Sequence, residues 1–407
     1  MRRLLNAYRR AFAGLPRTVW ALAAAGLVNR SGSMVLPFLS LYLTTQLGFS
    51  PSTTGWVVGL YGTGSVGGSL LGGWLVDRLG AVRVQQMSLL GNALGFFLLP
   101  LARQRWSLAI VVLATSVVGE MLRPAMMSGA AQAAAPPVRA RAMALIRLAH
   151  NLGFAVGPAV GGVLATINYH WLFIADGGTC AAAAMLLGAV FGWRTRPAAV
   201  DHHGGPPGPA SWRRPAFAAF LAAVFALGMV FFQIFATLPL YWRHAWGLAE
   251  SRIGLLLGIN GVLIVSVEML LVHRLERHPP LRVAAVGSLL VCLGFALMAV
   301  GRGALWAAVT VLVWTIGEML AMPQINAVAA SQGGPGESGR TMGAFTLAFS
   351  LAFVVAPLTG MAVYQHWGGT ALWLGIGALG PLLATTLWLL APHLGGHDHA
   401  AAPGLSG

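Results

Sequence analysis

The sequence predicts an all-α membrane protein with twelve transmembrane helices in two pseudo-symmetric six-helix bundles. Its composition, its twelve apolar segments and an internal repeat predict this fold. Of the 407 residues, 57% are hydrophobic and 9% are charged, and the mean hydropathy is +0.74. A soluble domain typically carries about 25% charged residues. The chain therefore cannot cover itself with a water-facing surface, and we expect it to lie in a lipid bilayer.

The apolar segments are long enough to cross a bilayer, because a transmembrane helix needs about 20 residues. Short connections rich in turn residues separate most of them. The predicted spans are 18–44, 53–76, 82–101, 106–130, 142–165, 170–192, 215–242, 252–273, 282–301, 304–328, 341–364 and 369–391.

One connection, 194–214, is longer, polar and rich in Gly and Pro. It predicts a cytoplasmic linker between an N-terminal six-helix bundle, 1–193, and a C-terminal six-helix bundle, 215–392. The remaining residues, 393–407, are predicted to form a disordered cytoplasmic tail. Their histidines favour a disordered tail over a metal site, because no rigid scaffold precedes them.

The arginines are distributed unevenly between the two sides of the predicted membrane. The formal net charge of +15 could indicate nucleic-acid binding, but 17 of the 25 basic residues fall on one side. Cytoplasmic loops retain positive charge, so both termini are predicted to be cytoplasmic and no nucleic-acid partner is expected. The first apolar stretch is too long for a cleaved signal peptide. The only cysteines, Cys180 and Cys292, lie in apolar stretches and indicate neither a disulfide framework nor a metal site.

The two halves of the sequence repeat each other at a shift of 199 positions. Landmark residues then coincide, and both halves contain the tetrapeptide Gly-Glu-Met-Leu, at 119–122 and 317–320. A parallel repeat of six helices is typical of transporters that bind substrate near the membrane midplane, between the halves. The coincident pairs include Tyr42 with Tyr241, Gly48 with Gly247, Gly55 with Gly254, Gly59 with Gly258, Pro124 with Pro323 and Pro158 with Pro357.

The loop after the second span carries Gly73, Asp77, Arg78, Gly80 and Arg83 in the order G-x-x-x-D-R-x-G-x-x-R. This pattern resembles the loop motif of the major facilitator superfamily. We expect Gly73 to permit close helix packing, Gly80 to permit a tight turn, and Asp77 to face a helix N-terminus. The resemblance implies that this helix is the eleventh, which starts near Arg340, and that the contact acts as a cytoplasmic gate.

The fifth span contains Gly153, Gly157, Pro158, Gly161 and Gly162. The pattern resembles an element of the drug/proton antiporter group within that superfamily. Glycines one turn apart permit close helix contact, and a buried proline kinks a helix. The alternative is ordinary helix packing without a role in coupling.

Ionisable residues at membrane depth are costly and indicate function. Glu318 and Glu120 lie at the same depth in the tenth and fourth spans and are predicted to carry protons, Glu318 above all. Arg123 is three residues from Glu120 and shares its helix face. Arg30, in the first span, is predicted either to bind substrate or to be a structural counter-charge for Glu120. The alternative for both carboxylates is a purely structural ion pair.

The remaining site candidates are Arg147, Tyr61, Trp314 and Asn260, which are predicted to contribute to substrate binding or counter-charge. Aromatic side chains suit an apolar, adaptable pocket, although most face lipid or other helices. Asp176, in the outer third of the sixth span, is expected to act as a gate or simply to contact water.

The tenth span also resembles the signature of proton-coupled oligopeptide transporters, around Trp314, Glu318 and Pro323. The first span departs from that family, because Asn29 stands where its Glu would be. The leading prediction is a proton-coupled antiporter that exports amphipathic small molecules or drugs by alternating access. The alternative is a proton-coupled importer of peptides or other zwitterions. An enzyme is not expected, since no catalytic constellation lies at membrane depth. We expect no cofactor or metal beyond the proton gradient, a monomer, and a place in the bacterial inner membrane.

Overall fold

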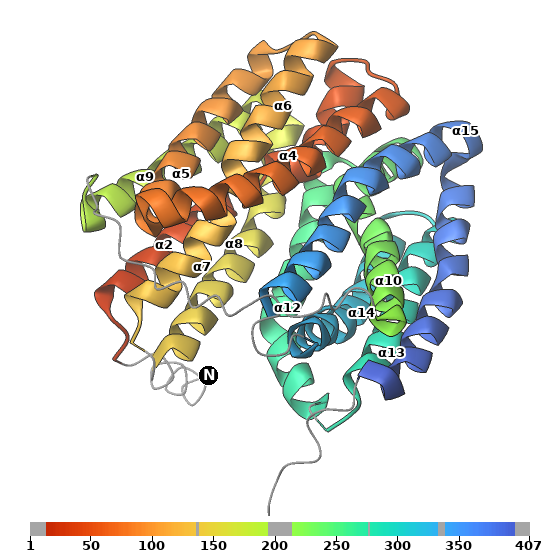
Figure 1. Ribbon diagram of the computed structural model, residues 1–407. Helices are drawn as coiled ribbons and strands as arrows, with labels where there is room; N and C mark the ends of the chain where they lie inside the picture. The colour runs from red at the N-terminus through yellow and green to blue at the C-terminus, as the bar shows by residue number, and fades with distance from the viewer. Residues whose placement is uncertain (1–13, 136–137, 194–213, 276, 333–337, 395–407) are drawn as a thin grey trace, which may run out of the picture. The chain divides into compact units, whose positions relative to one another are not determined.

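The computed structural model describes residues 14–135, 138–193, 214–275, 277–332 and 338–394, and the regular structure in these ranges is helical (Figure 1). The predicted linker lies outside the described residues except for Arg214, and the predicted tail lies outside them beyond Leu394. The helices of the first half are α2 (Arg17–Ser31), α3 (Val35–Leu41), η1 (Tyr42–Gln46), α4 (Pro51–Leu79), α5 (Ala81–Leu98), η2 (Leu99–Leu101), α6 (Arg105–Glu120), α7 (Leu122–Ala133), α8 (Arg139–Ile167) and α9 (His170–Phe191). Those of the second half are α10 (Pro215–Phe231), η5 (Phe232–Phe235), α11 (Thr237–His244), α12 (Glu250–Leu275), α13 (Pro280–Ala296), η6 (Leu297–Ala299), α14 (Ala304–Ser331) and α15 (Ser338–Leu394).

These helices confirm the twelve predicted spans. Ten described segments are long and apolar enough to cross a membrane. The last of them, α15, contains two helices joined at Gly368, whose φ of 80° interrupts the helix. The remaining span is α4, which has 29 residues but contains eight glycines and is therefore less apolar than the others. We call the side of the membrane on which the first span begins the proximal side, and the opposite side the distal side.

Local sequence explains where the helices begin and end. The Ser50 hydroxyl accepts a hydrogen bond from the Thr53 N–H at 3.2 Å, and Pro51 occupies the first helical position of α4. Gly48 and Gly247, which coincide in the repeat, both adopt positive φ, at 67° and 64°. Such a conformation favours glycine, so the repeat extends to the backbone of the two distal turns.

The first and seventh spans are both interrupted at repeat-related positions. The first is divided into α2 and α3 around Gly32, and the seventh into α10 and α11 by the 3₁₀ turn η5. Non-helical backbone within a membrane needs hydrogen-bond partners from the protein. At the first interruption Asp176 supplies such partners.

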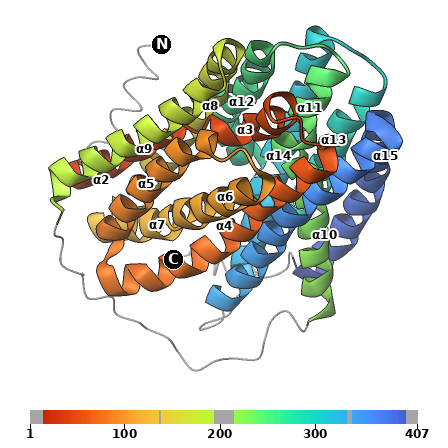
Figure 2. The same cartoon turned by 90° about the horizontal axis from the view of Figure 1, so that it is seen from above.

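The described residues belong to two compact units. The first contains residues up to 201 together with Phe235–Val265, and the second contains 202–234 and 266 onward. Within the first unit α2 packs against α8 and α9, α5 packs against α9 and α6, and α11 contacts α3; α2, α9 and α5 lie side by side in Figure 2. The predicted bundle limits, 1–193 and 215–392, stay predictions.

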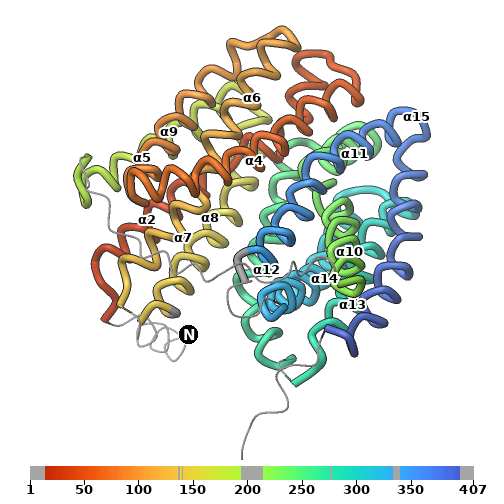
Figure 3. Tube along the Cα trace, viewed as in Figure 1, coloured from red at the N-terminus to blue at the C-terminus, as the bar shows by residue number. Residues whose placement is uncertain are grey.

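In the second unit α13 packs against α14 and α15, and α10 packs against α15 (Figure 3). The rings of Trp314 and Trp373 each lie 5.9 Å from the Phe295 ring, between centroids, with nearly parallel planes. All three side chains are fully buried. The aromatic stack therefore joins α13, α14 and α15.

The repeat is also visible in packing. A Cβ on Gly161 would lie 2.9 Å from the Cβ of Met34, and a Cβ on Gly360 would collide with the Gln233 amide. Both residues of the first contact map onto those of the second at a shift of 199. In each half, the fifth helix of the repeat therefore packs closely against the interrupted first helix of the repeat.

Candidate functional site

The interruption of the first span is held by a buried carboxylate from α9. Asp176 Oδ2 accepts hydrogen bonds from the N–H groups of Met34 and Val35, at 3.2 and 3.1 Å. These amides belong to the beginning of α3, where a helix lacks internal partners for its N–H groups. Asp176 is only 3% exposed. The expectation that it contacts water is therefore wrong for this structure.

Charged and polar side chains from several helices converge beside this interruption. Tyr61 on α4 is close enough to Glu120, Asp176 and Arg30 for their charges to act on it. His150 on α8 is within reach of the Arg30 and Arg123 charges. The structure thus brings Arg30, Tyr61, Glu120 and Arg123 near one another and places His150 and Asp176 beside them. Their roles in proton coupling and substrate binding stay predictions.

Glu120 and Arg123 lie at a kink between α6 and α7. Glu120 Oε2 is 3.5 Å from Arg123 Nη2, with side-chain exposures of 15% and 59%. Pro124 has no N–H to bond the carbonyl of Glu120, which explains why α6 ends there. The geometry confirms that the two side chains share a helix face, and more than half of the Arg123 side chain stays exposed.

The glycine element of the fifth span packs against the interruption. A Cβ on Gly153 would lie 2.7 Å from the Cβ of Arg30, and one on Gly157 would lie 3.1 Å from the carbonyl oxygens of Arg30 and Ser33. Gly161 faces Met34. Glycine spacing in α8 therefore sets how closely Arg30 and the break approach this helix, as the sequence predicted for close helix contact.

Gly162 of the same element faces α12 instead. A Cβ on Gly162 would lie 2.9 Å from the Cα of Gly254, and one on Gly254 would collide with the carbonyl of Pro158. Further along, a Cβ on Gly258 would lie 3.1 Å from the carbonyl oxygen of Ala155. Small residues on both helices thus allow α8 and the first part of α12 to pack backbone to backbone.

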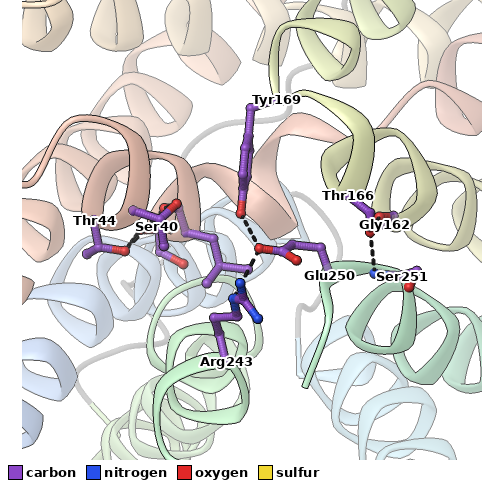
Figure 4. A network of polar contacts seen from close by, with 10 residues as sticks. Ser40, Thr44, Gly162, Thr166, Tyr169, Arg243, Glu250 and Ser251 are labelled. Atoms are coloured by element: carbon purple, nitrogen blue, oxygen red, sulfur yellow. Dashed lines mark hydrogen bonds and ion pairs between the residues drawn. The ribbon is translucent and has the colours of Figure 1, made fainter. Parts of the chain in front are cut away.

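A polar network lies at the distal end of this contact (Figure 4). The Tyr169 hydroxyl donates a hydrogen bond to Glu250 Oε1 at 2.9 Å, and Arg243 Nε lies 3.2 Å from the same oxygen. The Ser251 N–H donates to Thr166 Oγ1 at 3.1 Å. We call Tyr169, Arg243 and Glu250 the distal latch.

The distal latch combines a half-buried ion pair with a phenol that keeps its proton. Glu250 is 10% exposed and Arg243 is 39% exposed. Burial, and then the Glu250 carboxylate, raise the pKa of Tyr169. The Tyr169 hydroxyl therefore stays a donor over the whole physiological pH range. The latch joins the α8–α9 connection to α11 and α12.

The loop motif after the second span lies in the first unit, and only its contacts within that unit are described. Gly80, with φ of 84°, forms the predicted tight turn between α4 and α5. The close packing predicted for Gly73 is wrong in this structure: a Cβ there would meet nothing within 4 Å, whereas one on Gly72 would lie 2.7 Å from the Cα of Met121. The reason is that Gly72 faces α7 and its neighbour does not. Asp77 and Arg83 are exposed, and Arg78 stacks 3.9 Å over the Trp74 ring.

Glu318 and Trp314 lie in the second unit on α14. Glu318 is half-buried, whereas Trp314 is 0% exposed and packs on Gly294 and Phe295. A side chain without accessible surface cannot contact a solute, so the structure corrects the assignment of Trp314 to substrate binding and gives it a packing role. In the first unit Asn260 is buried on α12 and Arg147 is exposed on α8.

We therefore expect Trp314→Ala to lower the free energy of unfolding by about 3–5 kcal/mol, the usual cost of truncating a buried Trp. Trp314→Phe keeps a ring against Phe295 and should lose less. Thermal unfolding of the purified protein in detergent measures both. A variant with unchanged stability and altered transport would contradict the packing role.

Sequence reasoning missed Tyr169, Arg243 and Glu250 as a group. Each lies near a span end, where polar residues are common, so none is unusual alone. Asp176 was noticed, but its partners are backbone amides, which carry no sequence signal. The break in the first span before Met34 has a sequence signal, because Gly32 and the two serines beside it favour a helix end.

A model of the Major Facilitator Superfamily matches residues 21–357. The uncharacterized MFS-type transporter YttB of Bacillus subtilis is 25% identical over 393 residues, with 92% of this chain and 95% of the relative covered. A Na(+), Li(+), K(+)/H(+) antiporter of Planococcus maritimus is 22% identical over 386 residues, covering 86% of this chain and 90% of the relative.

The multidrug resistance protein MdtH of Photorhabdus laumondii matches a shorter stretch, with 25% identity over 152 residues that cover 37% of this chain and 38% of the relative. Among solved structures, the peptide transporter POT in complex with sulfate has a TM-score of 0.79, at 18% identity, and covers 94% of this chain and 96% of that chain. At this identity the similarity concerns the fold.

Proposed function

The chain belongs to the major facilitator superfamily, and from this premise we propose that it is a proton-coupled antiporter that exports amphipathic small molecules by alternating access. The protein is a multi-pass membrane transporter and not an enzyme. The proposal concerns its coupling ion, its substrate and its direction.

The observation that carries the proposal is the set of ionisable groups at membrane depth. Glu120, Arg123 and Arg30 converge beside the interrupted first span, and Glu318 lies at the corresponding depth of α14. Ionisable groups at this depth are costly and typically mark ion or substrate pathways. We assign proton uptake to Glu318 and Glu120, and contact with the solute to Arg30 and Arg123.

Two relatives support the direction. The names of the Planococcus protein and of MdtH describe a cation/proton antiporter and a multidrug resistance protein. The second candidate is a proton-coupled importer of peptides or other zwitterions. It is supported by the tenth-span pattern around Trp314, Glu318 and Pro323, which resembles the signature of proton-coupled oligopeptide transporters.

The arginine distribution supports a membrane orientation with the proximal side in the cytoplasm, because 17 of the 25 arginines flank proximal segments. Bacterial relatives support the inner membrane as the location. We propose that the protein acts as a monomer, driven by the proton gradient without a further cofactor.

Transport in proteoliposomes tests the function. With an inward-directed proton gradient, ethidium, an amphipathic dye, should be expelled by an antiporter, whereas a symporter should accumulate dialanine, a zwitterion. Glu318→Gln, which removes the charge and keeps the size, should reduce the proton-driven flux to that of protein-free liposomes. The exchange of labelled for unlabelled solute should persist, because it needs no net proton movement.

Glu268→Gln is the matched control, since Glu268 is another partly buried carboxylate of the second unit, near the proximal end of α12. It should leave the flux within twofold of the unmodified protein. An unchanged flux and an unchanged pH dependence in Glu318→Gln would remove this residue from the coupling mechanism.

A further inference from the structure

Asp176 is a buried carboxylate whose described partners are two backbone amides and a thiol. Its Oδ2 atom accepts from the Met34 and Val35 N–H groups, and its Oδ1 atom lies 4.0 Å from the Sγ atom of Cys180. A carboxylate at a helix N-terminus is stabilised by the orphan N–H groups and by the helix dipole. Its negative charge therefore fixes the first turn of α3.

The opposite end of α3 leads to the distal latch. Tyr42 follows α3 directly, and its ring lies 4.9 Å from the Phe173 ring and 6.0 Å from the Tyr169 ring, between centroids. Tyr169 in turn donates to Glu250. With seven residues at about 1.5 Å each, α3 is only about 10 Å long. A displacement of the first turn of α3 therefore reaches Tyr42 and Tyr169 through a short and closely packed helix.

We propose that Asp176 is a further proton-binding residue of the transporter, and that its charge state controls the position of α3 and, through α3, the closure of the distal side. This inference rests on the proposed proton coupling. A hydronium ion of the aqueous phase supplies a proton to Oδ2 when the site opens, the proton later returns to the aqueous phase, and no other bond changes. The resulting carboxylic acid is a weaker acceptor for the two amides, so α3 is held less firmly.

Within the described part of the chain, few ionisable groups face Asp176. Arg30 on α2 acts on it through its charge, Tyr61 on α4 is within electrostatic reach, and Cys180 lies one turn along α9. Asn29 and Asn92 donate hydrogen bonds to the Cys180 sulfur, at 3.3 and 3.7 Å. Arg30 is therefore the described charge that opposes protonation of Asp176, and a solute anion that engages Arg30 would favour protonation.

A labelling experiment tests the inference without a transport substrate. Ser251→Cys places a thiol beside the latch, and both native cysteines are buried. Its reaction rate with a membrane-impermeant maleimide is measured from mildly alkaline to mildly acidic pH. Division by the rate of Ser107→Cys, at an exposed distal position, removes the intrinsic pH dependence of thiol reactivity. The ratio should rise severalfold as the pH falls, because protonation releases α3.

Asp176→Asn should keep the protein folded, since its side-chain oxygen still accepts from both amides, and should make the ratio independent of pH. Asp176→Glu keeps a titratable carboxyl and should retain the pH dependence, and it serves as the second variant if the Asn protein does not fold. A ratio that does not vary with pH in the unmodified protein, or that still varies in Asp176→Asn, overturns the inference. Absence of proton-driven flux in the unmodified protein would instead overturn the proposed function, so the two failures are distinguishable.

Discussion

Gly254→Val is expected to reduce transport to the level of protein-free liposomes. A Cβ at this position would collide with the carbonyl of Pro158 and lie 2.8 Å from the Cα of Gly162. These neighbours are backbone atoms in helices, so they cannot rotate away as a flexible side chain would. In the proposed alternating-access cycle the distal side must close, and we expect the backbone-to-backbone packing of α8 on α12 to close it.

The matched control is Gly178→Val on α9, where an added Cβ would meet nothing within 4 Å. Both substitutions replace a glycine by the same β-branched side chain within a membrane helix, so they share the same change in helix propensity. Proteoliposome flux and the labelling rate of Ser251→Cys are the measurements. The Gly254 variant should label faster because the distal side stays open. Normal flux in that variant would show that the contact is not required for transport.

The spans were predictable because hydropathy, turn residues and the repeat all depend on local sequence. Gly48 and Gly247 illustrate this, since their shared positive φ follows from glycine at equivalent turns. The interruption at Gly32 was not predicted, although Ser31, Gly32 and Ser33 interrupt the apolar pattern there. Its partners could not be predicted, because Asp176, which accepts from the exposed amides, lies more than 140 positions away.

The candidate site was predictable in part. Charge at membrane depth is rare, so Arg30, Glu120 and Arg123 could be selected from composition, and they do converge. Trp314 could not be judged in this way, because the sequence does not tell whether an aromatic ring faces a solute or Phe295. Gly73 and Gly72 show the same limit: adjacent glycines differ only in which one faces α7.

Glu250→Ala is expected to shift the protein toward a state that is open on the distal side. The substitution leaves the buried Tyr169 hydroxyl and the half-buried Arg243 guanidinium without their shared acceptor. Leaving a buried donor unsatisfied typically costs about 1–3 kcal/mol. Since every 1.4 kcal/mol is tenfold in an equilibrium constant, the population of the open state should rise roughly tenfold. The labelling rate of Ser251→Cys should rise accordingly.

Tyr169→Phe separates the two arms of the latch. It removes only the hydroxyl, keeps the ring against Tyr42, and leaves the ion pair intact, so we expect a smaller rise in labelling than in Glu250→Ala. Arg243→Ala, introduced both into the unmodified protein and into the Glu250→Ala variant, completes a double-mutant cycle. If the three residues act as one latch, the double variant should label no faster than Glu250→Ala alone, because the acceptor is already gone. Additive effects would mean that Arg243 closes the distal side independently of Glu250.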